Sequence, residues 1–431
     1  MCGQKPWNAT GPTVIGRGYF AKPSDFWPGR IEDVRVYNRV LTDLDALALY
    51  QGAPATSPVR PPAIPLTVRG PYNSTWQASN SAPGTWATFW NGNVKAITGI
   101  ARIDGTAYTF FGAPSNISGS LKQTQLEVTP TQSRFEFQGA GVTIYLTFLS
   151  PVEANDIRRL SIPFSYLYAQ AQTNDGNTHN VSLYFDISGE WAYGTETALI
   201  KWGTQDVVHA GGNLRVHTIT PGTPIVLSEA NDYPTWGTVV WATNTLPSGF
   251  TWQSGADATV RGLFVSSGQL NNTVDPNMPR AINNNYPVFA FDFALGNIDG
   301  QPAGPFVMAL GHVRTPAVSY LGKNVAPLWK SYWTNWENML SFAYDDAASS
   351  ATQRADTLDE TISSSATQAN GSHYAALTAL ALRQTFGGVE LVGTSARPWM
   401  FLKEISSSGN VSTVDVIYPS SPAVSADLVV R

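Results

Sequence analysis

Residues 142–148 read VTIYLTF, a stretch in which apolar side chains alternate with threonine and tyrosine. Because successive side chains of a strand point to opposite sides, Val142, Ile144, Leu146 and Phe148 form one buried face. Other short segments rich in β-branched and aromatic residues, bounded by Gly, Asn, Asp and Pro, are Ala107–Phe111, Arg134–Phe137, Ser182–Ile187, Thr238–Ala242, Val288–Phe293 and Phe306–Leu310. No helical pattern interrupts them. The sequence therefore predicts a mainly β protein, built on a large antiparallel β-sandwich at residues 66–332.

The composition agrees with broad β surfaces. Only 13% of the 431 residues are charged and 12% are aromatic, with 14 tryptophans, whereas soluble domains usually contain about 25% charged residues. A chain of this length predicts about two to four domains. The formal net charge of -5 offers no basic patch, which argues against a nucleic-acid partner. No apolar run reaches the ~18 residues that a membrane span needs.

The segments before the predicted sandwich have a different pattern. Residues 1–52 contain an apolar strand at Ile31–Tyr37 and a short helix at Leu41–Tyr50. Residues 53–65 are rich in proline and small residues, which cannot form a packed element. We interpret residues 53–65 as a linker between two units.

After the sandwich, residues 333–431 predict a small α+β segment. Alanine-rich stretches with apolar residues at helical spacing predict two helices, and a Gly-Asn turn between two apolar runs predicts a β-hairpin. The helices are expected at Met339–Ile362 and Gly371–Gly387, and the strands at Trp399–Ser406 and Val411–Tyr418.

Cysteine and histidine offer no metal site. Cys2 is the only cysteine, so an intrachain disulfide and a cysteine-based metal site are excluded. The histidines occur without H-x-x-H or H-E-x-x-H spacing, so no metal and no cofactor is predicted. They lie at His179, His209, His217, His312 and His373.

Seven N-x-S/T sequons predict N-glycosylation and hence an extracellular location. The alternative is chance, because the chain is rich in Ser, Thr and Asn. Met1 is not followed by a charged start and an apolar core, so no signal peptide begins there, and we expect the natural protein to start upstream. The sequons are at Asn8, Asn73, Asn116, Asn180, Asn271, Asn370 and Asn410.

Residues 397–422, RPWMFLKEISSSGNVSTVDVIYPSSP, contain the best candidates for chemistry. In Lys403-Glu404, a carboxylate beside a cation in an apolar strand could have a shifted pKa and face a cleft. Neighbours in a strand point to opposite faces, however. One of the two is therefore expected to be solvent-exposed or to bridge to the sandwich, and a structural role for Glu404 is favoured over a catalytic one.

Other candidates have structural alternatives that we favour. Asp345-Asp346 could be paired acid/base carboxylates, but adjacent acids near a helix start complement its dipole. His312 at the end of an apolar strand is expected to be a satisfied turn histidine, and Ser188 has no nucleophile-elbow context. Four tryptophans could stack on a sugar, although packing in a β core is the default: Trp76, Trp86, Trp90 and Trp191.

Residues 26–41, FWPGRIEDVRVYNRVL, resemble the closing strand and helix of a laminin-G or concanavalin-like lectin jelly roll. That pattern is G-x-I-D-[DE]-V-R-[VI]-Y-N-R-x-L, with Glu32 here in place of the usual Asp. The resemblance implies that residues 1–52 are the C-terminal remnant of a lectin domain, with its sugar-binding loops upstream of Met1.

A second resemblance covers most of the chain. The blocks look, in the same order, like the secreted fungal glutaminase A family. They are LTVRGPYNSTW (66–76), FWNGNVKAITGIARIDGTAYTFFGAP (89–114), VTIYLTFLSPVEANDIRRLSIPFSYLYA (142–169), DISGEW (186–191), ALGHVRTPAVSY (309–320), HYAALTALALRQTFGGVEL (373–391) and FLKEISSSGNVSTVDVIYP (401–419).

This resemblance implies an N-terminal β-sandwich followed by an α/α barrel of the six-hairpin glycosidase type. It implies an extracellular hydrolase that releases ammonia from the side-chain amide of L-glutamine, with its cleft in the barrel facing the sandwich. We expect this chain to hold the sandwich and the start of the barrel region, to lack the catalytic carboxylates, and so to be inactive alone. Residues after Met339 are expected to pack poorly.

Two other functions remain open. The lectin-like remnant and the aromatic residues suggest a carbohydrate-binding or cell-wall-associated module. Six-hairpin barrels also commonly cleave sugars with two carboxylates, and a fold alone cannot choose between substrates. The sequence blocks favour the glutaminase-like hydrolase, with glutamine as its small-molecule substrate.

Overall fold

The computed structural model describes residues 17–20, 22–26, 61–153, 155–405 and 409–425. The chain divides into two compact units, Met1–Ser57 and Pro58–Arg431. In the first unit, β1 (Arg17–Phe20) and β2 (Lys22–Phe26) pair antiparallel. The predicted strand and helix of the lectin-like segment lie outside the described residues, so that prediction is not tested.

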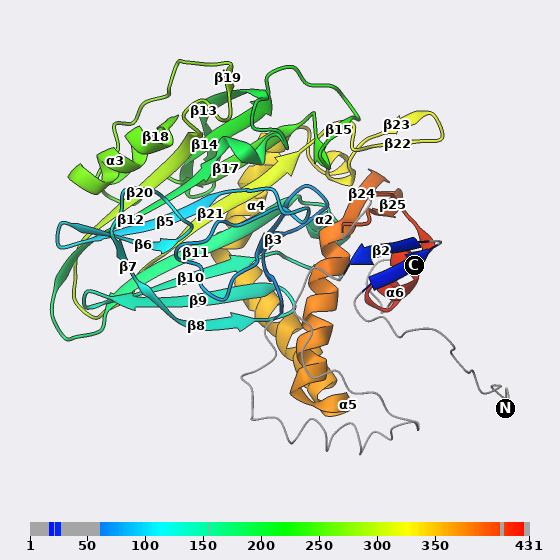
Figure 1. The fold of residues 1–431 in the computed structure, drawn as a ribbon, viewed down its shortest axis with the longest axis horizontal. Coiled ribbons are helices and arrows are strands. Elements are labelled where there is room, and N and C mark those ends of the chain that lie inside the picture. Colours follow the sequence, from blue (N-terminus) through cyan, green and yellow to red (C-terminus); the bar gives the residue numbers. More distant parts are fainter. Residues whose placement is uncertain (1–16, 21, 27–60, 154, 406–408, 426–431) are drawn as a thin grey trace. The chain divides into compact units, whose positions relative to one another are not determined.

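The second unit contains a nine-stranded sheet whose strands all pair antiparallel (Figure 1). Its strands, in order across the sheet, are β19 (Arg280–Ala281), β13 (Leu199–His209), β14 (Gly212–Pro221), β17 (Thr238–Asn244), β21 (Ala303–Val313), β11 (Phe164–Thr173), β10 (Val142–Leu149), β9 (Gln132–Gly139) and β8 (Lys122–Val128).

A six-stranded sheet lies against it. Its strands are antiparallel except for the parallel pair β6–β7. In order they are β18 (Phe250–Ala256), β20 (Pro287–Ile298), β12 (His179–Ser188), β5 (Ile97–Ile103), β6 (Thr106–Phe111) and β7 (Gly119–Ser120). All of the segments predicted as strands between residues 107 and 310 fall within the two sheets, which confirms the mainly β, sandwich-like prediction.

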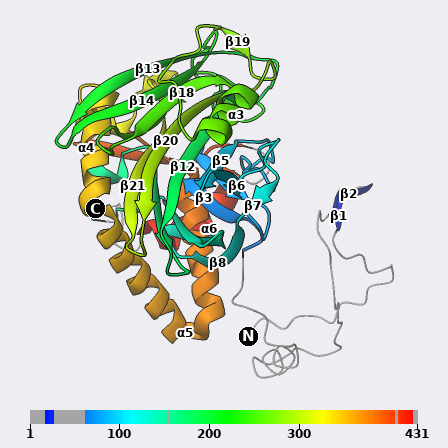
Figure 2. The ribbon, with the colours of Figure 1, turned by 90° about the vertical axis from the view of Figure 1, so that its left-hand side faces the viewer.

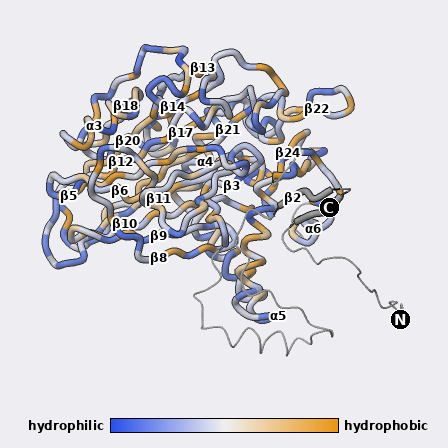
Figure 3. The backbone as a smooth tube through the Cα atoms, viewed as in Figure 1, coloured by the Kyte–Doolittle hydropathy of each residue, from blue (hydrophilic) through white to orange (hydrophobic). Residues whose placement is uncertain are grey.

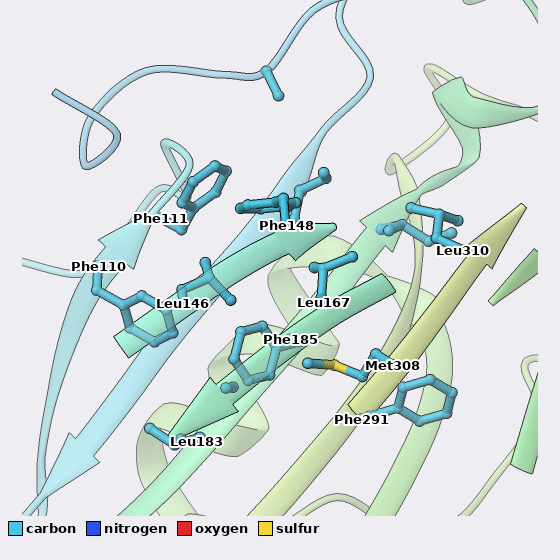
Figure 4. Packing of buried hydrophobic residues seen from close by; sticks show 14 of the residues in the cluster. Phe110, Phe111, Leu146, Phe148, Leu167, Leu183, Phe185, Phe291, Met308 and Leu310 are labelled. Carbon is cyan, nitrogen blue, oxygen red and sulfur yellow. The ribbon is translucent and has the colours of Figure 1, made fainter. Parts of the chain in front are cut away.

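The main core lies between the two sheets (Figure 4). Leu146 and Phe148 of β10 point into it, as the alternation of VTIYLTF predicts, and meet Phe110, Phe185 and other apolar side chains. Each such side chain stabilises the fold by roughly 1.5–3 kcal/mol on full burial. Hydrophobic positions accordingly recur along the strands of both sheets (Figure 3).

Helices cover the outer faces of both sheets. The helix α3 (Asp257–Ser267) packs Val260 and Phe264 on the six-stranded sheet. The helix α4 (Trp336–Ser349) and the start of α5 (Ala351–Gly388) pack on the nine-stranded sheet (Figure 2). Met339 and Leu340 are fully buried there. The expectation of poor packing after Met339 is therefore wrong for α4, because its apolar stripe fits the outer face of the sheet.

Both stretches predicted as helices are helical, but Met339–Ile362 is divided between α4 and the first half of α5. The helix α5 bends at Asn370 and Gly371, whose backbone angles are non-helical, and its two halves fold back on each other (Figure 2). Gly371 has a φ of 78°, a conformation that favours glycine. The two halves form a helical hairpin, with Leu382 and Phe386 of the second half in a smaller core cluster.

The predicted C-terminal hairpin is wrong in its pairing. The strand β25 (Arg397–Leu402) pairs with β24 (Val389–Thr394), which precedes it. In the described part of this segment a single antiparallel bridge joins Lys403 to Val411, and residues Val414–Ser425 form the helix α6. A run of β-branched residues favours a strand only weakly; here Val416 packs instead as part of a helix against the cluster under α5.

Short elements complete the described structure. They are α2 (Ile157–Leu160), η1 (Gly189–Trp191), η2 (Leu328–Ser331), and the two-stranded ladders β3 (Ile64–Val68) with β4 (Ser74–Gln77), β15 (Glu229–Ala230) with β16 (Tyr233–Pro234), and β22 (Val318–Tyr320) with β23 (Lys323–Val325). Among the residues that the structure describes, no helix is both long and apolar enough to cross a membrane.

Candidate functional site

Lys403 and Glu404 lie between the sandwich and the helical hairpin, directly after β25. Both are buried, with 5% and 3% of their surface exposed. The Lys403 ammonium donates to Glu229 Oε1 of the sandwich at 2.7 Å, while the Glu404 carboxylate accepts from the Gly409 backbone N–H at 3.3 Å. Of the two outcomes expected for this pair, the structure shows the bridge to the sandwich.

Glu229 joins three distant parts of the chain. Its Oε1 accepts hydrogen bonds from the Tyr72 hydroxyl and from the Lys403 ammonium, so a carboxylate, a phenol and a cation meet at one oxygen. These residues line a cleft of about 500 Å³, which we call the Glu229 cleft. Trp236 and Glu390 lie on its wall. The volume falls within the ~300–1,000 Å³ usual for small-molecule pockets.

A guanidinium and two aromatic rings surround the Tyr72 ring. The Arg314 guanidinium lies 4.2 Å from the ring centroid and also pairs with Glu390, and the edges of Trp236 and His312 approach the ring. Burial raises the pKa of Tyr72 above its usual range. The phenol therefore remains a hydrogen-bond donor toward Glu229 at neutral pH.

Behind Tyr72 lies a buried cation, Lys95. Its ammonium donates to the Tyr72 carbonyl at 2.7 Å and lies 4.2 Å, 4.7 Å and 5.0 Å from the ring centroids of Phe89, Tyr233 and Trp191. Burial lowers the pKa of Lys95 well below its usual value. The three aromatic rings stabilise the protonated form of Lys95 by cation–π contacts. The hydrogen bond to the Tyr72 carbonyl fixes the backbone that carries Tyr72.

A second cleft lies on the other side of Lys403. It has a volume of about 630 Å³, and we call it the aromatic cleft because Trp76, Phe89 and Trp90 line it together with Gln384, Glu404 and Asp415. Lys403 borders both clefts. We call the region between the sandwich and the helical hairpin the junction. It contains two clefts whose lining residues differ in chemistry.

Only two of the four candidate tryptophans reach these clefts. Trp76 and Trp90 line the aromatic cleft. Trp191 lies in the main core and donates from Nε1 to the Ala96 carbonyl at 2.9 Å, and Trp86 lies beside Arg261. Core packing, the expected default, therefore holds for Trp191.

Asp345 and Asp346 are not part of the junction. They lie near the C-terminal end of α4, so the expected role at a helix start is wrong. Asp345 accepts from His209 at 2.7 Å, and Asp346 pairs with Arg159 and Arg354. Through these partners the two carboxylates attach α4 to neighbouring segments. This is a structural role that requires no catalysis.

The described residues contain no group of His, Cys, Asp or Glu able to hold a metal ion. His312 is buried, and burial lowers its pKa well below the usual value, so the ring is neutral beside Tyr72. His179 instead bonds Asp104 and Asp175, which raise its pKa.

Ser188 donates its hydroxyl proton to Glu190 Oε2 at 2.6 Å, and both residues are buried. Burial raises the pKa of Glu190 to about 7. A carboxyl group with a pKa near 7 can exchange protons at neutral pH, but neither residue lines the two clefts. We assign the pair a structural role.

The raised pKa of Glu190 makes stability depend on pH. Between pH ~4.5 and ~7 the folded state binds more protons at this site than the unfolded chain, so stability falls as pH rises through that window. Glu190→Gln removes this penalty. Relative to the unchanged protein, the variant should gain roughly 2–3 kcal/mol between pH 4.5 and pH 8, measured by urea unfolding at both values.

Asp292, whose pKa burial also raises to about 7, is present in both proteins, so its contribution cancels in that comparison. Glu127→Gln, at an exposed position on β8, serves as the control and should show no pH-dependent gain. Identical pH profiles for Glu190→Gln and the unchanged protein would contradict the assignment.

The sequons differ in accessibility. Asn73 is 4% exposed, and its amide donates to the Leu310 carbonyl at 3.0 Å. A glycan there would have to displace this packing, which argues against glycosylation at Asn73, while Asn8 lies outside the described residues. For the remaining sequons glycosylation stays a prediction, as does an extracellular location. Their asparagines, all exposed, are Asn116, Asn180, Asn271, Asn370 and Asn410.

Sequence reasoning missed Tyr72, Glu229 and Lys95. Tyr72 and Glu229 are 157 residues apart, and Glu229 and Lys403 are 174 apart. No local pattern marks a single tyrosine or glutamate in a loop. The blocks LTVRGPYNSTW and FWNGNVKAITGIARIDGTAYTFFGAP contain Tyr72 and Lys95, but they did not indicate a role for either residue.

Two family models match neighbouring regions of this chain. A family model described as "Domain of unknown function (DUF5127)" matches residues 131–365, and one described as "Glutaminase A six helical-hairpin domain" matches residues 371–426. The Glu229 cleft takes Glu229 from the first region and Lys403 from the second.

Two fungal proteins are similar over most of this chain. Glutaminase A of Aspergillus oryzae is 39% identical over 391 residues, which cover 88% of this chain and 55% of that protein. A probable glutaminase of Arthroderma benhamiae is 29% identical over 398 residues, which cover 85% of this chain and 45% of that protein. The chain spans about half the length of these relatives.

Proposed function

Because this chain belongs to the glutaminase A family, we propose that it forms part of a hydrolase that releases ammonia from the side-chain amide of L-glutamine. The observation that supports this is the cluster of Tyr72, Glu229 and Lys403. It lies in a cleft between the regions that the two family models match.

Amide hydrolysis needs groups that this cluster can supply. Water adds to the amide carbon and loses a proton to a base, and the carbon–nitrogen bond breaks as the leaving nitrogen takes up that proton and departs as ammonia. The Glu229 carboxylate suits a base that accepts the proton of the attacking water. The Lys403 ammonium has three N–H groups and can donate to the negative charge that develops on the amide oxygen, while the single proton of the Tyr72 hydroxyl is directed at Glu229.

We propose that residues 58–431 supply one side of the site and that groups outside them complete it. The chain corresponds to only 55% of the Aspergillus oryzae protein. Within the second matched region the structure describes the second half of α5, β24, β25 and α6. Further helical hairpins would be needed to close the Glu229 cleft against water.

The test uses this chain and a chimera. Purified residues 1–431 should release no ammonia from L-glutamine above the buffer rate in a coupled ammonia assay. A chimera in which residues 58–431 replace the aligned part of Aspergillus oryzae glutaminase A should release ammonia. In the chimera, Glu229→Gln and Lys403→Met should each lower kcat/KM by about 100-fold or more.

Glu360→Gln, an exposed carboxylate on α5, is the matched control and should leave the rate unchanged. Turnover by residues 1–431 alone would refute the incomplete site. An inactive but folded chimera would count against glutamine hydrolysis, and full activity in Glu229→Gln would remove Glu229 from the mechanism.

A further inference from the structure

The aromatic cleft has a lining that differs from that of the Glu229 cleft. We propose that the aromatic cleft binds a neutral carbohydrate, separately from any chemistry at Glu229. This goes beyond the proposed function, since glutamine hydrolysis needs no second cleft. The argument rests on the shape, the aromatic surface and the charge of its lining.

Aromatic side chains form one wall. Trp76, Phe89 and Trp90 come from β4 and the loop after it, and Trp76 is fixed because its Nε1 donates to Ser74 Oγ at 3.0 Å. The Phe89 and Trp90 ring centroids are 5.4 Å apart. A rigid aromatic surface with a polar edge suits a ligand that has both an apolar face and polar groups, as a sugar ring does.

Residues with hydrogen-bond acceptors also line the cleft. Gln384 of α5, Glu404 after β25 and Asp415 of α6 line the cleft. Carboxylate and amide oxygens accept hydrogen bonds from hydroxyl groups, which a sugar supplies in number.

Charge selects a neutral ligand over an anionic one. Among the described residues that line the cleft, Lys403 is the only cation, and its ammonium donates to Glu229, which lines the neighbouring cleft. Glu404 and Asp415 therefore leave the aromatic cleft negative. The carboxylate of a free amino acid or of an acidic sugar would be repelled there, whereas a neutral oligosaccharide would not.

The size of the cleft is consistent with this ligand. Its volume of about 630 Å³ lies within the ~300–1,000 Å³ of typical ligand sites, which are mostly apolar with a few placed polar groups. The aromatic cleft therefore meets the general description of a binding site without any contribution from the Glu229 cluster.

The test measures binding by residues 1–431 directly. Titration calorimetry with maltotriose, cellotriose and chitotriose should show saturable binding of at least one of them, with a Kd between about 10 µM and 10 mM. Trp90→Ala and Asp415→Asn should each weaken that binding by about tenfold or more. Trp86→Ala, outside the cleft, should leave it unchanged.

Gln384→Trp provides a variant that tests the site without removing any core residue. Gln384 is exposed on α5, so a tryptophan there should fill the cleft and abolish binding while the melting temperature is preserved. Absence of saturable binding for all three sugars at about 50 mM would overturn the proposal. So would equal losses in Trp86→Ala and Trp90→Ala, or L-glutamine binding that Trp90→Ala abolishes. None of these readouts depends on ammonia release.

Discussion

Replacing Asp359 by alanine is expected to detach the helical hairpin of α5 from the sandwich. Asp359 is 5% exposed, and its Oδ2 accepts hydrogen bonds from Thr129, Thr131 and Gln132 in the turn between β8 and β9. Buried donors that lose their acceptor are costly. The free energy of unfolding measured in urea should fall by about 3–5 kcal/mol, with faster hydrogen exchange in α5.

A buried arginine adds to this cost. Arg383, in the second half of α5, is 1% exposed and donates to the Pro65 and Leu66 carbonyls. Burial lowers its pKa to about 10, and the charge of Asp359 opposes that shift. Without Asp359 the guanidinium has less compensation for its burial. The second half of α5 also carries Gln384, so loosening it should disturb the aromatic cleft.

Asp356→Ala is the matched control. Asp356 lies one turn earlier on the same helix and pairs with Arg134, but its side chain is 56% exposed. An exposed pair of this kind contributes about 0–1 kcal/mol. If Asp356→Ala and Asp359→Ala lower the free energy of unfolding equally, the buried interaction stabilises the protein no more than the exposed one. That result would contradict the prediction.

Local patterns in the sequence were sufficient to locate the strands. The alternation in VTIYLTF corresponds to the burial of β10, and the segments at 182–187 and 288–293 pair side by side as β12 and β20. The order of the strands was not predictable, because β21 pairs with β17 and with β11, which both lie far away in the chain. Such pairing depends on packing between distant segments.

The same limit explains what was missed at the C-terminus and in the clefts. Val414–Tyr418 looks like a strand by composition, yet it is helical because its packing against α5 decides its structure. Lys403 and Glu404 were identified from a charged pair in an apolar run. Glu229 was not, because its role depends on meeting Tyr72 and Lys403 in space.

The second large effect is expected on the opposite face of the sandwich, where Arg261→Met should lower the free energy of unfolding by about 3–5 kcal/mol. Arg261 of α3 donates from Nε and Nη2 to the two oxygens of Asp186, at 2.8 Å and 3.0 Å. Asp186 on β12 has no exposed surface. Removing the guanidinium leaves a buried carboxylate with the Tyr184 hydroxyl at 2.6 Å as its remaining side-chain donor.

The double variant Arg261→Met/Asp186→Leu separates charge burial from lost packing. Two apolar residues of similar volume remove both charges together, so most of the lost stability should return. Arg102→Met is the control, since Arg102 donates only to the Val265 and Ser266 carbonyls at the end of α3 and should cost about 1 kcal/mol or less. If the double variant is as unstable as Arg261→Met, the loss comes from packing under α3 rather than from an unpaired charge.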